Sequence, residues 1–110
     1  MEIIREDKDD ITLCKINGKF DAIAAPEAEK VISKIISDGA KKIIMNMEKV
    51  GYISSSGLRA LLVAAKDIKA QKGKIIICSM TESVNKVFEI SGFSTIFETY
   101  DTEMDAMKHF

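Results

Sequence analysis

The fold of this chain is organised around the stretch Tyr52-Ile53-Ser54-Ser55-Ser56-Gly57-Leu58-Arg59-Ala60-Leu61-Leu62. This stretch joins a strand-like run, Ile43–Met47, to a helix-like run that ends near Gln71. The first turn of a helix has unpaired backbone N–H groups and the positive end of the helix dipole, so a phosphate placed there is partly neutralised by the fold. A serine at this joint can therefore be a helix cap, a phosphate ligand or a phosphate acceptor.

Length and composition indicate one globular domain over residues 1–110. The hydrophobic fraction of 46% and the charged fraction of 30% are those of a soluble protein. No apolar run reaches the roughly 18 residues of a membrane span. The first residues lack the basic and long apolar regions of a secretory signal, so we expect a cytoplasmic protein without a membrane partner.

Several classes of function are disfavoured by the composition. The net charge of −1, with lysines and acids interspersed, disfavours nucleic-acid binding. Cys14 and Cys78 lie in apolar runs without a CxxC pair, so we expect buried, reduced thiols and no metal site. His109, the only histidine, is the penultimate residue and therefore a poor base for a serine hydrolase. Since there is no Walker-type glycine loop either, we expect neither an enzyme nor a bound cofactor.

The chain alternates between short apolar runs and amphipathic helical patterns. The order β-β-α-β-α-β-α-β-α, with unbroken apolar runs in the interior strands, predicts an α/β fold in which a mixed sheet of about five strands is covered by about four helices. The predicted elements are strands at Glu2–Glu6 and Ile11–Ile16, a helix at Ala24–Asp38, a strand at Ile43–Met47, a helix from the serine joint to near Gln71, a strand at Lys74–Ser79, a helix from Thr81 to Gly92, a brief edge strand at Thr95–Glu98 and a last helix from Asp101 or Thr102.

Capping residues mark the helix boundaries. Pro26 suits a first helical turn, and Thr81 suits an N-cap. Gly39 and Gly92 can supply left-handed C-caps, and Gly73 ends the second helix.

The second strand has an unusual apolar phase. Ile11 and Leu13 alternate, whereas Cys14 and Ile16 follow with the opposite phase. Either both faces of this strand are covered or a bulge resets its register.

Several motifs together resemble those of a known family. They are the spacing Gly18-x-x-Asp21, the strand Ile43–Met47, the joint Ser54–Arg59 and the later pair Gly92-Phe93. These features are similar to the STAS domain, specifically that of the bacterial anti-sigma-factor antagonists. The resemblance covers nearly the whole chain, and its most specific part is the serine joint.

The resemblance implies a phosphorylation switch at the joint. In that family the serine or threonine directly before the glycine accepts a phosphate, which corresponds to Ser56 here, with Ser55 as the alternative acceptor. Gly57 then lets the helix backbone come close, and the acid that usually leads the joint is replaced by Ser54. The residues expected to contact the partner are Asp21, Ser54, Ser55, Gly57, Leu58 and Arg59.

The resemblance also implies the partners. The unphosphorylated protein captures an anti-sigma factor or serine kinase of the histidine-kinase-like ATPase type and so frees a sigma factor. The phosphorylated protein releases that partner, because the phosphate adds nearly two negative charges to the interface. A serine phosphatase resets the switch. The nucleotide belongs to the kinase, so this chain needs no cofactor.

The same residues also have simpler structural interpretations. Ser54 and Ser55 suit helix capping, and Asp21 suits a turn or a cap. Arg59 either pairs with a phosphate or a partner carboxylate or stays solvated.

Other functional alternatives remain open at this point. Phe20 and Ile53 belong either to the core or to an apolar contact patch. The chain could also serve as a STAS scaffold subunit of a signalling or lipid-transport assembly without a covalent switch. A small nucleotide- or anion-binding domain is the third interpretation.

Overall fold

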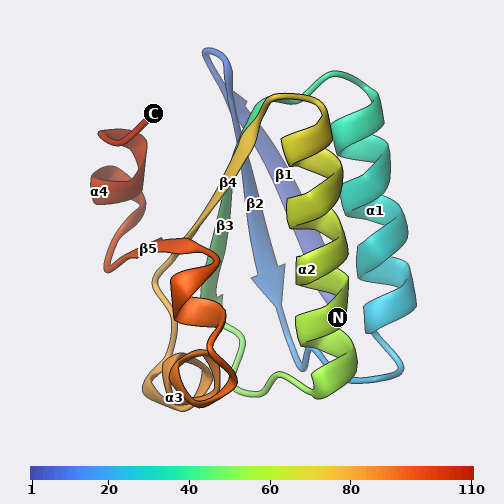
Figure 1. Cartoon of the computed structure of the whole chain (residues 1–110), viewed down its shortest axis with the longest axis vertical. Helices are drawn as coiled ribbons and strands as arrows, with labels where there is room; N and C mark the ends of the chain where they lie inside the picture. The colour runs from blue at the N-terminus through green and yellow to red at the C-terminus, as the bar shows by residue number, and fades with distance from the viewer.

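The computed structural model describes all 110 residues and contains one five-stranded mixed sheet (Figure 1). Strand β1 runs antiparallel to β2, and every other neighbouring pair is parallel. The strands lie side by side in chain order as β1 (Glu2–Lys8), β2 (Ile11–Asn17), β3 (Lys42–Lys49), β4 (Lys74–Cys78) and β5 (Glu98–Tyr100). The predicted α/β fold with a mixed sheet is confirmed.

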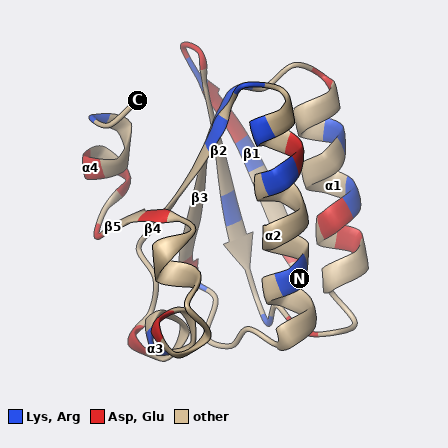
Figure 2. Ribbon diagram, in the orientation of Figure 1, with Lys and Arg blue, Asp and Glu red and all other residues tan.

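The helices cover the sheet unequally. Helices α1 and α2 pack side by side on one face, α4 contacts β3, β4 and β5 from the other face, and α3 lies at one end of the sheet (Figure 1). Both acidic and basic residues lie on the outer faces of α1 and α2 (Figure 2). None of the helices has the length and apolar character that crossing a bilayer needs. The helices are α1 (Ala25–Ser37), α2 (Ser55–Ala70), α3 (Glu82–Ser91), the short 3-10 helix η1 (Phe93–Thr95) and α4 (Glu103–Met107).

The interior of the sheet, strands β2 to β4, is buried on both faces, which explains the phase of β2. Cys14 and Ile16 belong to the larger apolar cluster under α1 and α2. Ile11 and Leu13 belong to a smaller cluster that includes Ala106 of α4. Both faces of this strand are therefore covered, and the pairing of β2 with β3 also shifts register near the end of β2.

Most of the predicted caps are confirmed. Gly39 and Gly92 have φ values of +110° and +81°, which glycine adopts without a steric cost. The hydroxyl of Thr81 accepts a hydrogen bond from the backbone of α3 at 3.3 Å. Of the two candidates for the start of α4, Thr102 is the N-cap, and Asp101 precedes it.

The end of α2 lies near Gln71, as predicted. The helix ends at Ala70 with Gln71 as its C-cap, and the left-handed residue is Lys72, with φ of +62°. Gly73 is needed for a different reason, because a Cβ atom there would lie 2.5 Å from the carbonyl oxygen of Lys41.

The prediction of the last strand at Thr95–Glu98 is wrong, because the strand begins only at Glu98. Strand β5 spans Glu98–Tyr100, and the residues before it form a 3-10 turn at Phe93–Thr95. The turn stacks the partly buried ring of Phe93 on the buried ring of Phe97, with their centroids 6.2 Å apart. The apolar run therefore serves an aromatic cluster, and the β pairing begins only after it.

The two free cysteines are buried, as predicted, and this has a measurable consequence. Burial raises the pKa of the Cys14 thiol from 9.0 to about 11, and it also raises the pKa of Cys78. We therefore expect the native protein to resist iodoacetamide at about pH 8, where unfolded cysteine reacts readily. Mass spectrometry after pulsed labelling measures the two rates.

The same pKa shift predicts a pH dependence of stability. Because the native pKa of Cys14 lies above the unfolded one, its contribution to stability is full below pH 9 and is lost as the pH rises from 9.0 toward about 11. Equal labelling rates for native and unfolded protein would contradict both expectations.

Candidate functional site

Two loops meet beyond the ends of β2 and β3. Phe20 and Ile53 form an isolated parallel bridge, in which the N–H of Phe20 donates to the carbonyl of Tyr52 at 3.0 Å. The N–H of Ser54 donates to the carbonyl of Phe20 at 2.9 Å. This bridge continues the parallel pairing of β2 and β3 and brings the loop of Asp21 beside the serine joint.

Ser54 is the N-cap of α2. Its Oγ accepts a hydrogen bond from the N–H of Gly57 at 3.1 Å and donates to the carbonyl of Phe20 at 3.4 Å. Its own carbonyl accepts from the N–H of Leu58 at 2.9 Å. The capping role considered for Ser54 is therefore confirmed, and its hydroxyl is occupied by the fold.

Replacing Ser54 tests this capping role. We expect Ser54→Ala to lower the free energy of unfolding by about 1 kcal/mol, because an N–H of the first turn loses its partner. Chemical denaturation of the variant and the wild type measures the difference. Ser55→Ala is the matched control and is expected to change stability by less than about 0.5 kcal/mol. Equal losses in both variants would contradict the assignment of Ser54 as the cap.

Ser55 and Ser56 occupy the first two positions of α2. Ser55 is exposed and Ser56 is half-buried. Neither hydroxyl makes a hydrogen bond within the chain, in contrast to that of Ser54. Their backbone N–H groups have no carbonyl partner either. The joint thus presents two free hydroxyls at the positive end of the helix dipole, where a phosphate dianion is favoured.

Gly57 and Leu58 face inward. A Cβ atom on Gly57 would lie 2.6 Å from the carbonyl oxygen of Phe20 and 2.8 Å from a side-chain carbon of Ile53. Leu58 is buried in the larger core cluster. Their contact with a partner stays a prediction, and their burial means that they contribute by positioning the first turn of α2.

Asp21 organises the loop that leads into α1. Its Oδ1 accepts hydrogen bonds from the N–H groups of Ile23 and Ala24, at 3.1 Å and 2.9 Å. Its carbonyl accepts from the N–H of Ala25 at 2.9 Å. The interpretation of Asp21 as a turn former is therefore confirmed, whereas its interpretation as a cap is wrong, because the N-cap of α1 is Ala24 and no side chain caps this helix. Its Oδ2 makes no hydrogen bond within the chain.

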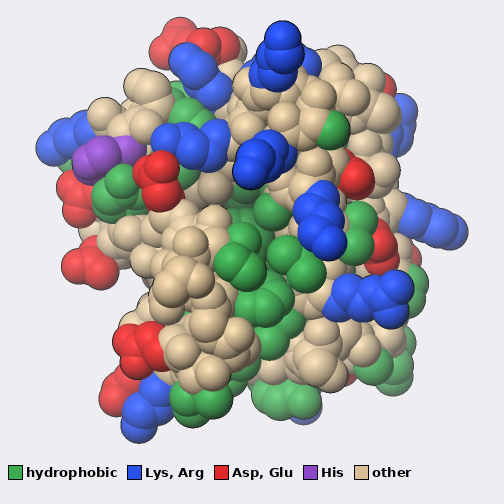
Figure 3. Space-filling view, in the orientation of Figure 1, with side chains coloured by type: hydrophobic (Ala, Val, Ile, Leu, Met, Phe, Trp, Pro, Cys, Tyr) green, Lys and Arg blue, Asp and Glu red, His purple; other side chains and the backbone are tan.

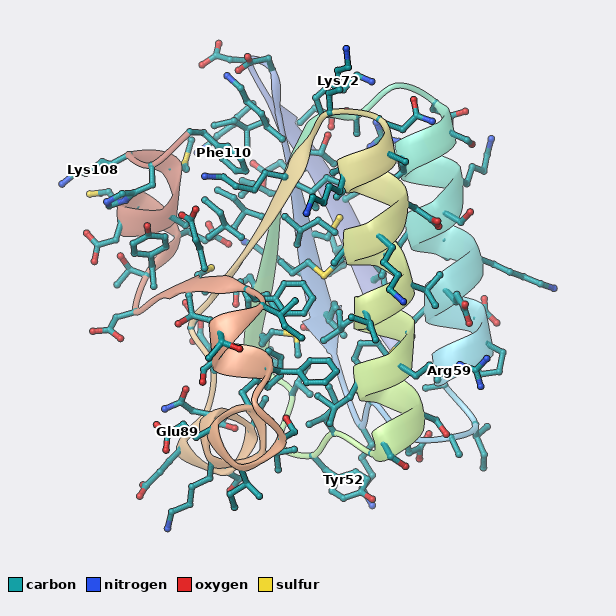
Figure 4. All side chains as sticks on the ribbon, viewed as in Figure 1. Tyr52, Arg59, Lys72, Glu89, Lys108 and Phe110 are labelled. Carbon is teal, nitrogen blue, oxygen red and sulfur yellow. The ribbon has the colours of Figure 1, made fainter.

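Arg59 is exposed on the first turns of α2 and forms no salt bridge with another side chain. Figure 4 shows Arg59 and Tyr52 at the end of the molecule where α2 begins. The guanidinium is therefore free to meet a group from outside the chain.

Two apolar residues beside the joint were missed in the sequence. Of the two interpretations of Phe20 and Ile53, the core position is confirmed, because both are buried. Ile23 and Tyr52 are instead the exposed ones, with 89% and 50% of their surfaces accessible. Ile23 lies in a turn, outside the apolar stripe of the helix that follows. This position in the sequence could have predicted that its side chain is exposed.

The chain is similar to a known domain family and to several known proteins. The family model described as the STAS domain matches residues 2–106. A Bordetella bronchiseptica protein, BtrV, described as a candidate anti-sigma factor antagonist, is 29% identical over 97 residues, covering 88% of this chain and 84% of BtrV. The anti-sigma-B factor antagonist of Staphylococcus aureus is 27% identical over 92 residues, covering 83% of this chain and 85% of that protein.

Solved structures of the anti-sigma factor antagonist SpoIIAA are also similar. Its unphosphorylated form has a TM-score of 0.84 at 26% identity and covers 98% of this chain and 95% of that chain. The phosphorylated form of the Bacillus protein has a TM-score of 0.76 at 25% identity and covers 98% of both chains.

Proposed function

Because the chain belongs to the STAS domain family, we propose that it is an anti-sigma factor antagonist whose binding to its partner is switched by phosphorylation of Ser56. The similarity to BtrV, to the Staphylococcus aureus antagonist and to SpoIIAA supports this class of function. SpoIIAA has been solved in a phosphorylated form, which supports a covalent switch in this fold.

The free hydroxyl of Ser56 in the first turn of α2 is the observation that carries the proposal. Ser54 has no free hydroxyl because it caps the helix. Ser55 is the alternative acceptor, since its hydroxyl is equally unpartnered and more exposed. Ser56 directly precedes Gly57, and this position matches the family acceptor.

The mechanism rests on charge. The unphosphorylated joint presents small neutral hydroxyls that an anti-sigma factor or serine kinase of the histidine-kinase-like ATPase type can cover. Phosphorylation adds nearly two negative charges, which the N-terminus of α2 stabilises within the chain. Across an interface the same charges lose their solvation without a matching partner, so the complex dissociates. A serine phosphatase restores the neutral joint, and the exchange takes place in the cytoplasm, where sigma factors act.

The proposed partner surface combines the joint with the neighbouring loop. Arg59 and Oδ2 of Asp21 offer opposite charges with no partner within the chain. The exposed side chains of Ile23 and Tyr52 offer the apolar contacts that dominate most interfaces.

Exposed apolar residues near the joint are expected to matter for binding and not for folding. We expect Ile23→Ser and Tyr52→Ser each to weaken partner binding about tenfold, because each removes apolar area from the interface. Isothermal titration with the purified partner measures this. Ile90→Ser on α3 is the matched control, since Ile90 is 86% exposed at a different surface. Equal effects at the three positions would contradict this surface.

Peptide-resolved mass spectrometry of the protein from its native cells, under two growth conditions, tests the proposed switch. A single phosphate on Ser56 whose amount varies with the condition is the expected result. Ser55→Ala should keep that phosphate and Ser56→Ala should lose it; the reverse pattern assigns the acceptor to Ser55. A joint that is unmodified under both conditions would contradict the switch and favour a STAS scaffold role.

A further inference from the structure

A second surface of α2 lies away from the serine joint. It is a groove of about 510 Å³ between the C-terminal half of α2, the start of β4 and the segment that follows η1. Figure 3 shows apolar side chains gathered in the middle of this face, with lysine and arginine side chains beside and above them. The groove residues used below are Leu62, Ala65, Lys66, Lys69, Ile75 and Ile96.

The floor of the groove is aliphatic. Leu62 and Ala65 are half-buried on α2, and Ile75 lies beneath them at the start of β4. Ile96 forms the opposite wall and is 50% exposed. Gly73 has no side chain to fill the head of the groove, and a Cβ there would already meet Lys41. No hydrogen-bonding side chain lies on this floor, so little would orient a small polar ligand.

The rim of the groove is basic. Lys66 and Lys69 are exposed, and neither forms a salt bridge within the chain. Lys74 is paired with Glu98 at 2.9 Å. No carboxylate lines the groove, although acidic and basic residues are nearly balanced over the whole chain. The groove therefore has a local excess of positive charge.

The spacing on α2 matches a helical partner. Leu62, Ala65, Lys66 and Lys69 are the i, i+3, i+4 and i+7 positions of one helix face. That face runs for about 10 Å along α2, or roughly two helical turns. A helix laid into such a groove would place its apolar stripe on the floor and its flanking side chains against the lysines.

We propose that this groove docks an acidic amphipathic helix of a partner protein. The aliphatic floor takes the apolar stripe of that helix, and Lys66 and Lys69 pair with its Asp or Glu side chains. A second copy of this chain is a poorer match, because its own longest exposed helix surfaces carry lysines together with acids. Lys69 lies about 20 Å from Ser56 along α2, at 1.5 Å per residue, so this surface can be occupied independently of the joint.

Two labelled peptides of about 14 residues test the proposal. Both carry leucines at helical spacing, and their flanking positions are glutamate in one peptide and lysine in the other. Fluorescence anisotropy with the intact protein should show binding of the acidic peptide at least about tenfold tighter than binding of the basic peptide. Lys66→Glu/Lys69→Glu should reverse this preference. Ile96→Ser should weaken the acidic peptide, and Ser56→Asp should leave its affinity unchanged.

Controls separate this groove from a general charge effect. Lys30→Glu/Lys86→Glu makes the same charge change on exposed positions of α1 and α3 and should leave the acidic peptide bound. Absence of binding, equal affinity for the two peptides, or full binding to Lys66→Glu/Lys69→Glu would each overturn the proposal. Binding of monomeric dodecanoate in the groove, without binding of the acidic peptide, would also overturn it and assign the groove to an anionic lipid.

Discussion

A Ser56→Asp variant is expected to bind the anti-sigma partner roughly a hundredfold more weakly than the wild type, a loss of about 3 kcal/mol. The half-buried position of Ser56 in the first turn of α2 is the reason. In a complex, a carboxylate there must give up its water and faces groups matched to a neutral hydroxyl. A phosphate, with a larger charge, should weaken binding at least as much. Isothermal titration with the purified partner measures the affinities of the wild type and of Ser56→Asp.

The fold itself should tolerate this charge. An acidic residue in the first turn of a helix stabilises it by about 0.3–1 kcal/mol, so the melting temperature of Ser56→Asp should stay within a few degrees of the wild type. Ser55→Asp provides the matched control, because it places the same charge one residue earlier at an exposed position. Loss of binding in Ser55→Asp alone would move the switch to Ser55. Tight binding by both variants would contradict the proposed mechanism.

Gly57→Ala is expected to destabilise the protein by about 3 kcal/mol, even though alanine is the better helix former. The added Cβ would lie 2.6 Å from the carbonyl oxygen of Phe20 and 2.9 Å from its ring. That carbonyl accepts the hydrogen bond from Ser54, so it cannot move without breaking the bridge between the two loops. The melting temperature should fall by more than about 10 °C.

Gly51→Ala is the control for this change. Nothing lies within 4 Å of a Cβ added at Gly51, and its backbone has no left-handed conformation. The substitution should change stability by less than about 1 kcal/mol. Differential scanning calorimetry of both variants separates the two cases. A Gly57→Ala protein as stable as Gly51→Ala would show that the first turn of α2 can move away from Phe20.

The two surfaces of α2 have different chemistry. The joint at its N-terminus combines free hydroxyls with exposed Ile23 and Tyr52. The groove along its C-terminal half combines an aliphatic floor with unpaired Lys66 and Lys69. The two surfaces share no residue, so we expect the proposed phosphorylation of Ser56 to leave the groove available. The two proposals together predict a chain that releases one partner while it holds another.

Much of the fold could be predicted because its signals are local. The interior strands are continuous apolar runs, and the helices carry caps such as Thr81 and Gly92 within a few residues of their ends. Parallel pairing then follows from the strand–helix–strand order, because the intervening helix returns the chain to the end of the sheet where the first strand began. The last strand could not be placed in this way. Its apolar run includes Phe97, and only the packing of that ring against Phe93 shows that Phe97 serves the core and not a strand.

The candidate site, too, could be predicted only in part from the sequence. Three serines before a glycine at a strand-to-helix junction already indicate a helix start at which a serine caps the helix, binds a phosphate or accepts one. The roles of the neighbours depend on a contact between residues 34 positions apart, Ser54 and Phe20. Where these segments meet, Phe20 is buried, a Cβ on Gly57 would lie 2.6 Å from the Phe20 carbonyl oxygen, and Ile23 and Tyr52 are exposed. Local patterns specify what each segment can form, whereas exposure depends on which distant segments pack together, and no single segment encodes that packing.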